Sequence, residues 1–153
     1  IQIYEAMVKT GNDVLDTILT EKSLACKENN IVVSCVADGK GLEFLHPIDL
    51  YTIFGNAMDN AIECVKNLQK QEKRQIDVLI HRQHQFLIVQ IMNPVEEELE
   101  FEDNLPVTTK HDKAYHGYGL RSIKNSVKKY NGVFQVKIKD GCFCLKILFP
   151  IKE

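Results

Sequence analysis

The chain has 153 residues, of which 44% are hydrophobic and 26% charged, proportions that are ordinary for a globular protein of one domain. Nineteen basic residues against 21 acidic ones give a net charge of −2, which predicts no general attraction to nucleic acid or to an anionic membrane surface. No apolar run approaches the ~20 residues of a membrane-spanning helix.

The cysteines and the first residue indicate the setting of the chain. The chain has five cysteines, an odd number, and no second Cys/His pair at zinc-ligand spacing completes a metal site. This pattern favours a reduced, cytoplasmic protein. The chain begins at Ile1, without a methionine and within a helical pattern. We therefore expect a fragment of a longer protein.

Hydrophobic periodicity divides the chain into helical and extended segments. A helical pattern covers 1–29 and is interrupted at Thr10-Gly11-Asn12, as a kink or as a cap that restarts the helix. A second helix begins near Pro47, a residue suited to the first helical position, and a third runs from Tyr118 to about Gly132. β-Branched residues and alternation predict strands at 31–37, 76–82, 86–93, 133–139 and 142–150.

The segment 94–116 differs in character from the rest of the chain. It contains a run of acidic residues and is punctuated by Pro94 and Pro106. A loop of this length in a compact domain is usually a functional lid or disordered. We expect a lid over about 94–116.

The order of these elements predicts an α+β fold of two layers. A helix, a strand, a long helix, two strands, the lid, a helix and a hairpin closed by Asp140-Gly141 follow one another. Because strands and helices do not alternate as in βαβ units, a doubly wound dinucleotide fold is not expected. We expect a mixed five-stranded sheet with three helices on one face.

Two asparagines lie beside the apolar stripe of the second helix. Asn56 and Asn60 are four residues apart, which places both amides on one side of a helix. Asparagine is a poor helix former, so two of them call for an explanation. They form either a solvated polar face or a set of amide oxygens held toward a hard cation such as Mg²⁺, which is commonly completed by substrate phosphates.

A glycine pair and a lysine add a second signal. His116-Gly-Tyr-Gly-Leu120 is expected to open a helix, where backbone N–H groups and the helix dipole favour an anion. In the lid, Thr108-Thr109-Lys110 places a lysine beside hydroxyls, which can neutralise phosphate, although a loop lysine is more often simply solvated.

In combination these motifs resemble the GHKL ATPases, which include histidine kinases, gyrase-type topoisomerases, Hsp90-type chaperones and MutL-type repair proteins. The shared order is Asn-x3-Asn on a helix, a strand ending in a polar residue, a lid, and Gly-x-Gly-Leu. Within that superfamily the chain looks like the receptor histidine kinases that answer peptide pheromones in Gram-positive bacteria. The segments that carry this narrower resemblance are Thr10–Asp16, Asn56–Glu63, Asn93-Pro94, Thr108–Lys113 and His116–Ile123.

The resemblance implies a Bergerat-type site for ATP and Mg²⁺. Asn60 would bind the Mg²⁺ that bridges the phosphates, and Asn56 would support it at the position where hydrolytic branches carry a water-activating Glu. An amide cannot act as that base, which suits transfer to a histidine better than rapid hydrolysis. Lys110 would approach the phosphates when the lid closes, and His116 would either contact nucleotide or have a structural role. The lid and glycine residues implied as ATP contacts are Thr109, Lys110, His116, Gly117, Tyr118, Gly119 and Leu120.

Two positions depart from the pattern of the superfamily. Most members read the adenine amino group with an Asp in Asp-x-Gly-x-Gly, where this chain has Asn93-Pro94-Val95. The Asn93 amide oxygen can still accept from that amine, with a weaker contact because it carries no charge. Glu63 stands where many histidine kinases carry a Lys, so we assign it no phosphate contact.

The resemblance also implies partners that lie outside the chain. None of the five histidines sits on a long helical hairpin that could present a phosphoacceptor, so that histidine is expected upstream of Ile1. Residues 1–20 would end the second dimerisation helix, and 21–153 would form the ATP-binding catalytic domain. The expected setting is a cytoplasmic domain of a membrane-anchored bacterial receptor that feeds a response regulator.

Two other functions remain open from the residues alone. A degenerate nucleotide-binding module acting by protein contact is favoured by the missing glycines after Asn93. An ATP hydrolase of the gyrase or chaperone type is disfavoured by Asn56 and by the small size of the chain.

Overall fold

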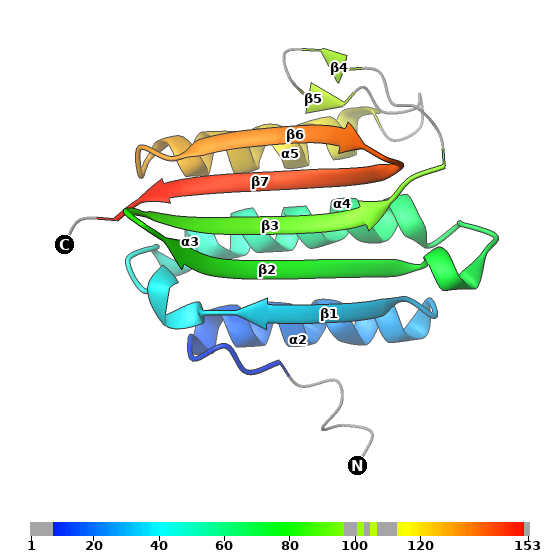
Figure 1. Ribbon diagram of the computed structural model, residues 1–153, viewed down its shortest axis with the longest axis horizontal. Helices are drawn as coiled ribbons and strands as arrows, with labels where there is room; N and C mark the ends of the chain where they lie inside the picture. The colour runs from blue at the N-terminus through cyan, green and yellow to red at the C-terminus, as the bar shows by residue number, and fades with distance from the viewer. Residues whose placement is uncertain (1–7, 97–100, 103–104, 107–112, 152–153) are drawn as a thin grey trace.

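A computed structural model describes residues 8–96, 101–102, 105–106 and 113–151, with side chains described for 8–96 and 118–151. Figure 1 shows the main sheet with helices behind it. The sheet has five strands in the order β1-β2-β3-β7-β6, and a separate pair, β4-β5, lies apart from it. β1 runs parallel to β2, and the other neighbours are antiparallel. The expected mixed sheet is confirmed.

The strands follow the alternation of the sequence. They are β1 (Val32–Ala37), β2 (Gln75–Gln83), β3 (Phe86–Pro94), β4 (Phe101–Glu102), β5 (Leu105–Pro106), β6 (Val133–Lys139) and β7 (Cys142–Pro150). The β6–β7 turn places Asp140 at φ 53° and Gly141 at φ 72°, the left-handed backbone that a tight hairpin requires. In β2, Ile76, Val78 and Ile80 are buried on the helix side, as the sequence predicts.

The helices cover one face of the sheet (Figure 1). The helices are α2 (Asp13–Glu28), α3 (Pro47–Leu50), α4 (Asn56–Val65) and α5 (Lys113–Lys128), with short 3-10 turns at Gly39–Leu42 (η1) and Gln71–Lys73 (η3). A π-helical turn, η2 (Tyr51–Gly55), joins α3 to α4 without a break. The core lies between this layer and the sheet, and its largest fully buried side chains are Phe54, Phe143 and Phe149.

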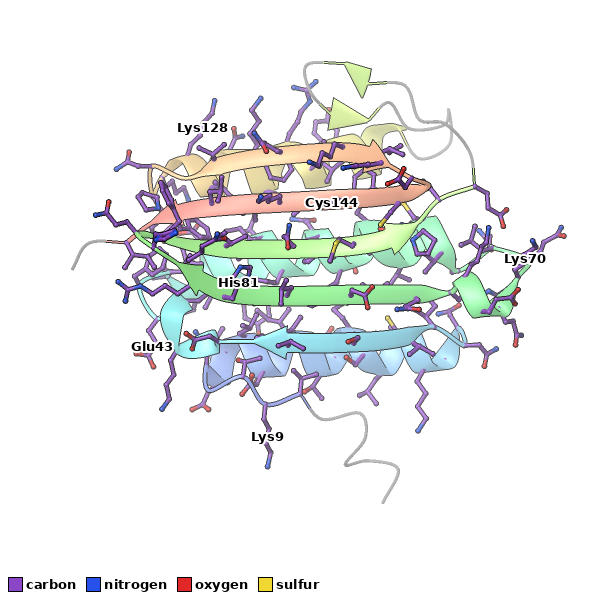
Figure 2. The ribbon with its side chains drawn as sticks, in the orientation of Figure 1. Lys9, Glu43, Lys70, His81, Lys128 and Cys144 are labelled. Carbon is purple, nitrogen blue, oxygen red and sulfur yellow. The ribbon has the colours of Figure 1, made fainter. Side chains whose placement is uncertain are left out.

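Among the described residues, no helix lies on the other face of the sheet. Figure 2 shows His81 of β2 and Cys144 of β7 on this side, in front of the strands. None of the helices in the described residues combines the length and the apolar composition needed to cross a bilayer.

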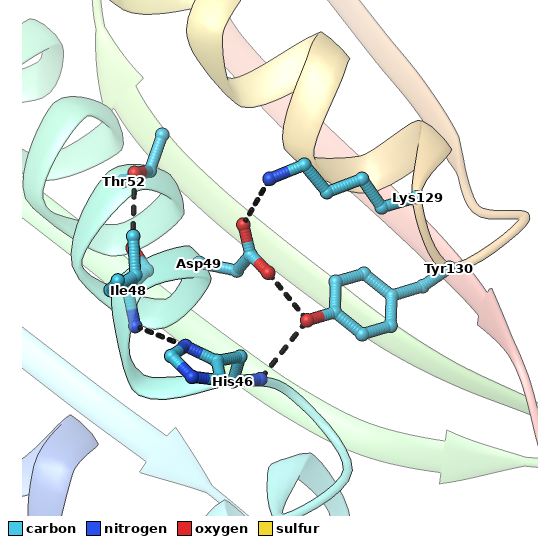
Figure 3. A network of polar contacts seen from close by, with 6 residues as sticks. All are labelled: His46, Ile48, Asp49, Thr52, Lys129 and Tyr130. Atoms are coloured by element: carbon cyan, nitrogen blue, oxygen red, sulfur yellow. Dashed lines mark hydrogen bonds and ion pairs between the residues drawn. The ribbon is translucent and has the colours of Figure 1, made fainter.

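A polar network joins the start of α3 to the end of α5 (Figure 3). The Tyr130 hydroxyl donates to Asp49 Oδ2 at 2.5 Å and accepts from the backbone N–H of His46 at 3.0 Å. Lys129 Nζ lies 3.1 Å from Asp49 Oδ1. Asp49 is only 5% exposed, so the network supplies the partners that a buried carboxylate needs.

Two helix boundaries differ from the sequence prediction. α2 begins at Asp13, where the Asn12 side chain caps it by accepting from Leu15 N, so the predicted cap at Thr10-Gly11-Asn12 is confirmed. Val8 and Lys9, which the helical pattern included, are not helical. α5 begins at Lys113, not at Tyr118, so the predicted lid of 94–116 overlaps its first turn. Tertiary packing of α5 overrides the low helix propensity of its glycines.

The predicted division at residue 20 falls inside α2. Leu15, Ile18 and Leu19 are buried in the same core as the sheet, so this stretch is packed as part of the domain. Residues 1–7 lie outside the described residues, and the dimerisation helix expected there stays a prediction.

Candidate functional site

One face of α4 carries the polar side chains that the sequence singles out. Asn56, Asn60 and Cys64 follow one another at intervals of four residues, so they form one stripe along the helix. Its first member faces α5 and its last faces β3, as the contacts below establish. Asn60 therefore lies midway along a face that reaches from one element to the other.

Asn56 lies at the junction of the π-helical turn and α4, against α5. Its Nδ2 donates to the carbonyl oxygen of Thr52 at 2.7 Å, which holds the amide in one orientation. A Cβ built on Gly119 of α5 would lie 3.3 Å from Asn56 Oδ1. The packing of α4 against α5 thus brings together two of the predicted site residues, Asn56 and Gly119. π-Helical turns inside helices are frequent at functional sites.

Asn60 is nearly buried, with 9% of its surface exposed. Within the described residues its amide has no hydrogen-bond partner. A nearly buried amide without a partner among the described residues is suited to an external ligand, because an unpaired polar group in this environment is costly. Its Oδ1 is of the donor type that Mg²⁺ prefers.

Asn93, at the end of β3, has a buried acceptor that no group of the protein uses. Its side chain is 1% exposed, and Nδ2 donates to the carbonyl oxygen of Pro94 at 3.0 Å. Oδ1 is buried and has no hydrogen-bond partner. The donor end of the amide is therefore occupied, and its free end can only accept.

Cys64 links this acceptor to α4. Burial raises the pKa of the Cys64 thiol to about 11, and a hydrogen bond from the Asn93 side chain opposes that rise. The contact places Asn93 at the end of the stripe that begins at Asn56. Cys64 was not predicted as a site residue, although its four-residue spacing from Asn60 could have placed it on the same face of the helix.

The glycine motif is helical here and not the loop that precedes a helix. Gly117 and Gly119 follow the first turn of α5, so the N–H groups left without intrahelical partners belong to Lys113–His116 instead. Tyr118 is 71% exposed, whereas the Leu120 side chain is in the core at 1%. The expectation that this motif opens the helix is therefore wrong for the structure as it stands.

Other predicted contacts are not placed. Thr109 and Lys110 lie outside the described residues, and His116 and Gly117 are described only as parts of the α5 backbone. Glu63, to which no phosphate contact was assigned, forms an ion pair with Lys66 at 2.6 Å.

A further ion pair, which was not predicted from the sequence, links α2 to α4 beside the stripe. Lys22 Nζ lies 2.8 Å from Asp59 Oδ1, and Asp59 directly precedes Asn60. Nothing in the spacing of the two residues along the chain could have indicated this pair, because it depends on how α2 packs beside α4.

Comparison with known proteins identifies the family. A family model described as the GHKL domain matches residues 45–150, more than half of the chain. The chain belongs to the GHKL domain family. A comparison by sequence with curated proteins found no match.

Solved structures show the same fold. The catalytic domain of the histidine kinase ThkA, in a nucleotide-free form, superposes with a TM-score of 0.67 and 16% identity over 90% of this chain and 91% of that one. A second nucleotide-free form gives 0.70 and 15%, over 93% of both chains. The histidine kinase AdeS of Acinetobacter baumannii gives 0.63 and 12%, over 92% of this chain and 64% of that one. At these identities the likeness is one of fold, and the fold is that of histidine kinase catalytic domains.

The residues present fit the ligands that GHKL domains bind, ATP and usually Mg²⁺. A purine amino group could donate to the buried Oδ1 of Asn93, which lacks a donor. Asn60 could hold a metal ion together with phosphate oxygens. The amine-bearing base of a nucleotide thus matches the Asn93 acceptor, and its charged phosphates match Asn60 with a metal ion, farther along the same face of α4.

Proposed function

We propose that this GHKL domain is the ATP-binding catalytic domain of a sensor histidine kinase, which transfers the γ-phosphoryl group of ATP to a histidine carried by another segment. The observation that carries the proposal is the buried, unpartnered acceptor of Asn93 at the end of the helix face that bears Asn60. An acceptor without a donor in the protein, at the end of the helix face on which the Asn60 amide also has no partner among the described residues, favours a nucleotide over a purely structural role.

Transfer, and not hydrolysis, is the chemistry that this site favours. Asn56 is an amide held by Thr52, and an amide cannot remove a proton from water. Catalysis of phosphoryl transfer rests mainly on positioning and charge neutralisation, which Asn60 with Mg²⁺ and Lys110 would supply. ATP would bring the γ-phosphoryl group, and the chain's own residues would bind, orient and shield it.

The phosphates would be held by the lid and the start of α5. Of these residues we assign contacts with the phosphates to Thr109, Lys110, His116 and the backbone of Gly117–Leu120. Because glycine costs a helix roughly 1 kcal/mol relative to alanine, Gly117 and Gly119 keep the first turns of α5 easy to rearrange around an anion.

The wider setting follows from the same proposal. The acceptor histidine would lie in a dimerisation segment that precedes this domain, and a response regulator would receive the phosphoryl group in turn. The motifs quoted from the sequence favour a peptide-pheromone receptor of a quorum-sensing two-component system. In that setting the domain is cytoplasmic and is carried by a membrane-anchored receptor.

Calorimetric titration with ATP, with and without Mg²⁺, tests the proposal. The chain should bind ATP more tightly with Mg²⁺, and Asn60→Ala should lose most of that increase because it removes the oxygen ligand. Asn67→Ala is the matched control, since Asn67 is exposed just beyond α4 and should bind ATP as the unmodified chain does.

Two results would contradict the proposal. Folded protein that binds no ATP at millimolar concentration would favour a regulatory module that acts by protein contact. Steady release of phosphate from ATP by the isolated chain, at a rate that Asn56→Ala does not change, would favour a hydrolase.

A further inference from the structure

The chain reverses direction immediately before α2. Gly11 has a φ of +96°, a conformation that other residues rarely adopt, and Asn12 then caps the helix. Residues 8–12 consequently run back along α2 instead of extending it. The N–H of Val8 donates to Thr20 Oγ1 at 3.0 Å, almost two turns into the helix.

Thr10 ties this returning segment to α2. Its backbone N–H and its hydroxyl both donate to Asp16 Oδ1, at 2.7 and 2.6 Å. Two hydrogen bonds to one carboxylate oxygen are charge-assisted and therefore stronger than neutral ones. Figure 2 shows that Lys9, the residue before Thr10, points away from the domain.

The same segment is tied to the connection that follows β1. The Gly39 N–H donates to the Thr10 carbonyl oxygen at 2.9 Å, and Asn12 Nδ2 donates to the Gly39 carbonyl oxygen at 3.1 Å. A Cβ at Gly39 would lie 2.0 Å from Thr10 Oγ1, so only glycine allows this approach. Residues of α2 and the connection after β1, which are far apart in the chain, thus both hold this short segment by hydrogen bonds.

We propose that Thr10, Asn12, Asp16 and Gly39 form an entry lock, a set of positioning residues that fixes the direction in which the preceding chain joins the domain. The inference rests on the proposed function in one respect: the preceding chain would carry the acceptor histidine. A rigid junction then limits the orientations in which that histidine meets the ATP site, and phosphoryl transfer depends strongly on orientation.

The lock also has a physical connection to the site. Asp16 lies on the same helix as Lys22, whose partner Asp59 directly precedes Asn60. Because Thr10 is hydrogen-bonded to Asp16, a rotation of the preceding chain would turn α2 with it and would not be absorbed by a flexible linker.

NMR on the 153-residue chain tests the lock. Residual dipolar couplings of the amides of residues 8–12 should fit the same alignment as those of α2, which a flexible linker would not do. Asp16→Ala should bring these couplings close to zero and speed hydrogen exchange of the Thr10 amide by on the order of tenfold, as expected for lost hydrogen bonds. Asp13→Ala, an exposed acid in the same helical turn, is the control for the helix dipole and should change neither.

Conservative substitutions of Thr10 distinguish the effect of losing its hydroxyl hydrogen bond from a general loss of stability. In Thr10→Ser the amide of residue 10 should exchange at the rate of the unmodified chain, and in Thr10→Val it should exchange faster. Only serine retains the hydroxyl that donates to Asp16. The lock would be refuted by couplings near zero in the unmodified chain, by couplings that survive Asp16→Ala, or by exchange that rises equally in β3 and β7.

The same variant distinguishes this inference from the proposed function. Asp16→Ala should bind ATP with unchanged affinity, since Asp16 is not one of the ATP contacts. A chain that shows the lock by NMR but binds no ATP would retain the rigid junction and lose the kinase proposal.

Discussion

Gly119 of α5 lies against Asn56 of α4, so closely that a Cβ at Gly119 would stand 3.3 Å from Asn56 Oδ1. Asn56 cannot simply turn away, because its Nδ2 donates to the Thr52 carbonyl oxygen at 2.7 Å. The glycine is thus needed for a close approach between two helices, in addition to any contact of its backbone with phosphate.

Gly119→Ala should weaken binding of Mg²⁺-ATP several-fold while leaving the fold intact. The added methyl group displaces the Asn56 amide, whereas the gain in helix propensity of up to about 1 kcal/mol offsets the crowding in the free protein. Gly55→Ala is the matched control, because a Cβ there meets nothing within 4 Å. It should stabilise the domain and leave ATP affinity unchanged. Equal ATP affinity in the two variants would contradict a role for this contact.

Asn93→Asp should destabilise the free domain at neutral pH by about 1–3 kcal/mol. A carboxylate oxygen would replace the Nδ2 that donates to Pro94, in a position only 1% exposed. Burial would raise the pKa of the new carboxyl group. A raised pKa in the folded state means that stability is retained at low pH and is lost as the pH rises through that value.

Urea unfolding at about pH 5 and about pH 7.5 measures this effect. The stability deficit of Asn93→Asp should be smaller at the lower pH. Asn125→Asp, at an exposed position on α5, should show little deficit at either. A deficit in Asn93→Asp that is the same at both pH values would show that folding does not raise the pKa of the new carboxyl group, and would contradict this prediction.

Tyr130→Phe should lower the free energy of unfolding by about 1–3 kcal/mol at neutral pH, because it leaves buried Asp49 short of a donor. The hydrogen bond from Tyr130 holds the pKa of Asp49 below its ordinary value, although burial opposes it. A depressed pKa contributes stability above the unfolded value, about 3.9, which is lost as the pH falls through the folded value.

The difference between the unmodified chain and Tyr130→Phe should therefore shrink in acid. Tyr51→Phe, whose ring is half exposed, is the matched control and should cost little. Thermal unfolding across the acid range gives the measurement, and a difference that stays constant down to about pH 2 would contradict the assignment.

Cys26 and Cys64 should resist alkylation in the folded chain. Burial raises the pKa of each thiol to about 11, so only on the order of 0.1% is thiolate at about pH 8. Iodoacetamide followed by mass spectrometry should find both unmodified in buffer and all five cysteines modified in urea. Modification of Cys64 in the folded chain at the rate seen in urea would contradict the raised pKa of that thiol beside Asn93.

Much of the fold could be predicted because its signals are local. Alternation in β2 and the Asp140-Gly141 turn are set by neighbouring residues, and the structure has both. The four-residue spacing of Asn56 and Asn60 likewise needed only the period of a helix to put them on one face.

The start of α5 could not be predicted in the same way. Two glycines argue locally against a helix over Gly117–Gly119, yet the structure extends α5 back to Lys113. The helix-breaking preference of a glycine is of the order of 1 kcal/mol, which packing of the helix against its neighbours outweighs.

What the sequence determined by itself is the order of the elements, the two-layer fold and the residue types of the site. Only the tertiary structure decided that Thr10 meets Gly39, that Asn56 meets Gly119, and that the Asn93 amide keeps one free acceptor. The physical reason is range: periodicity and turn chemistry act between residues a few positions apart. Which polar groups remain unpaired depends on contacts between elements that are distant in the chain.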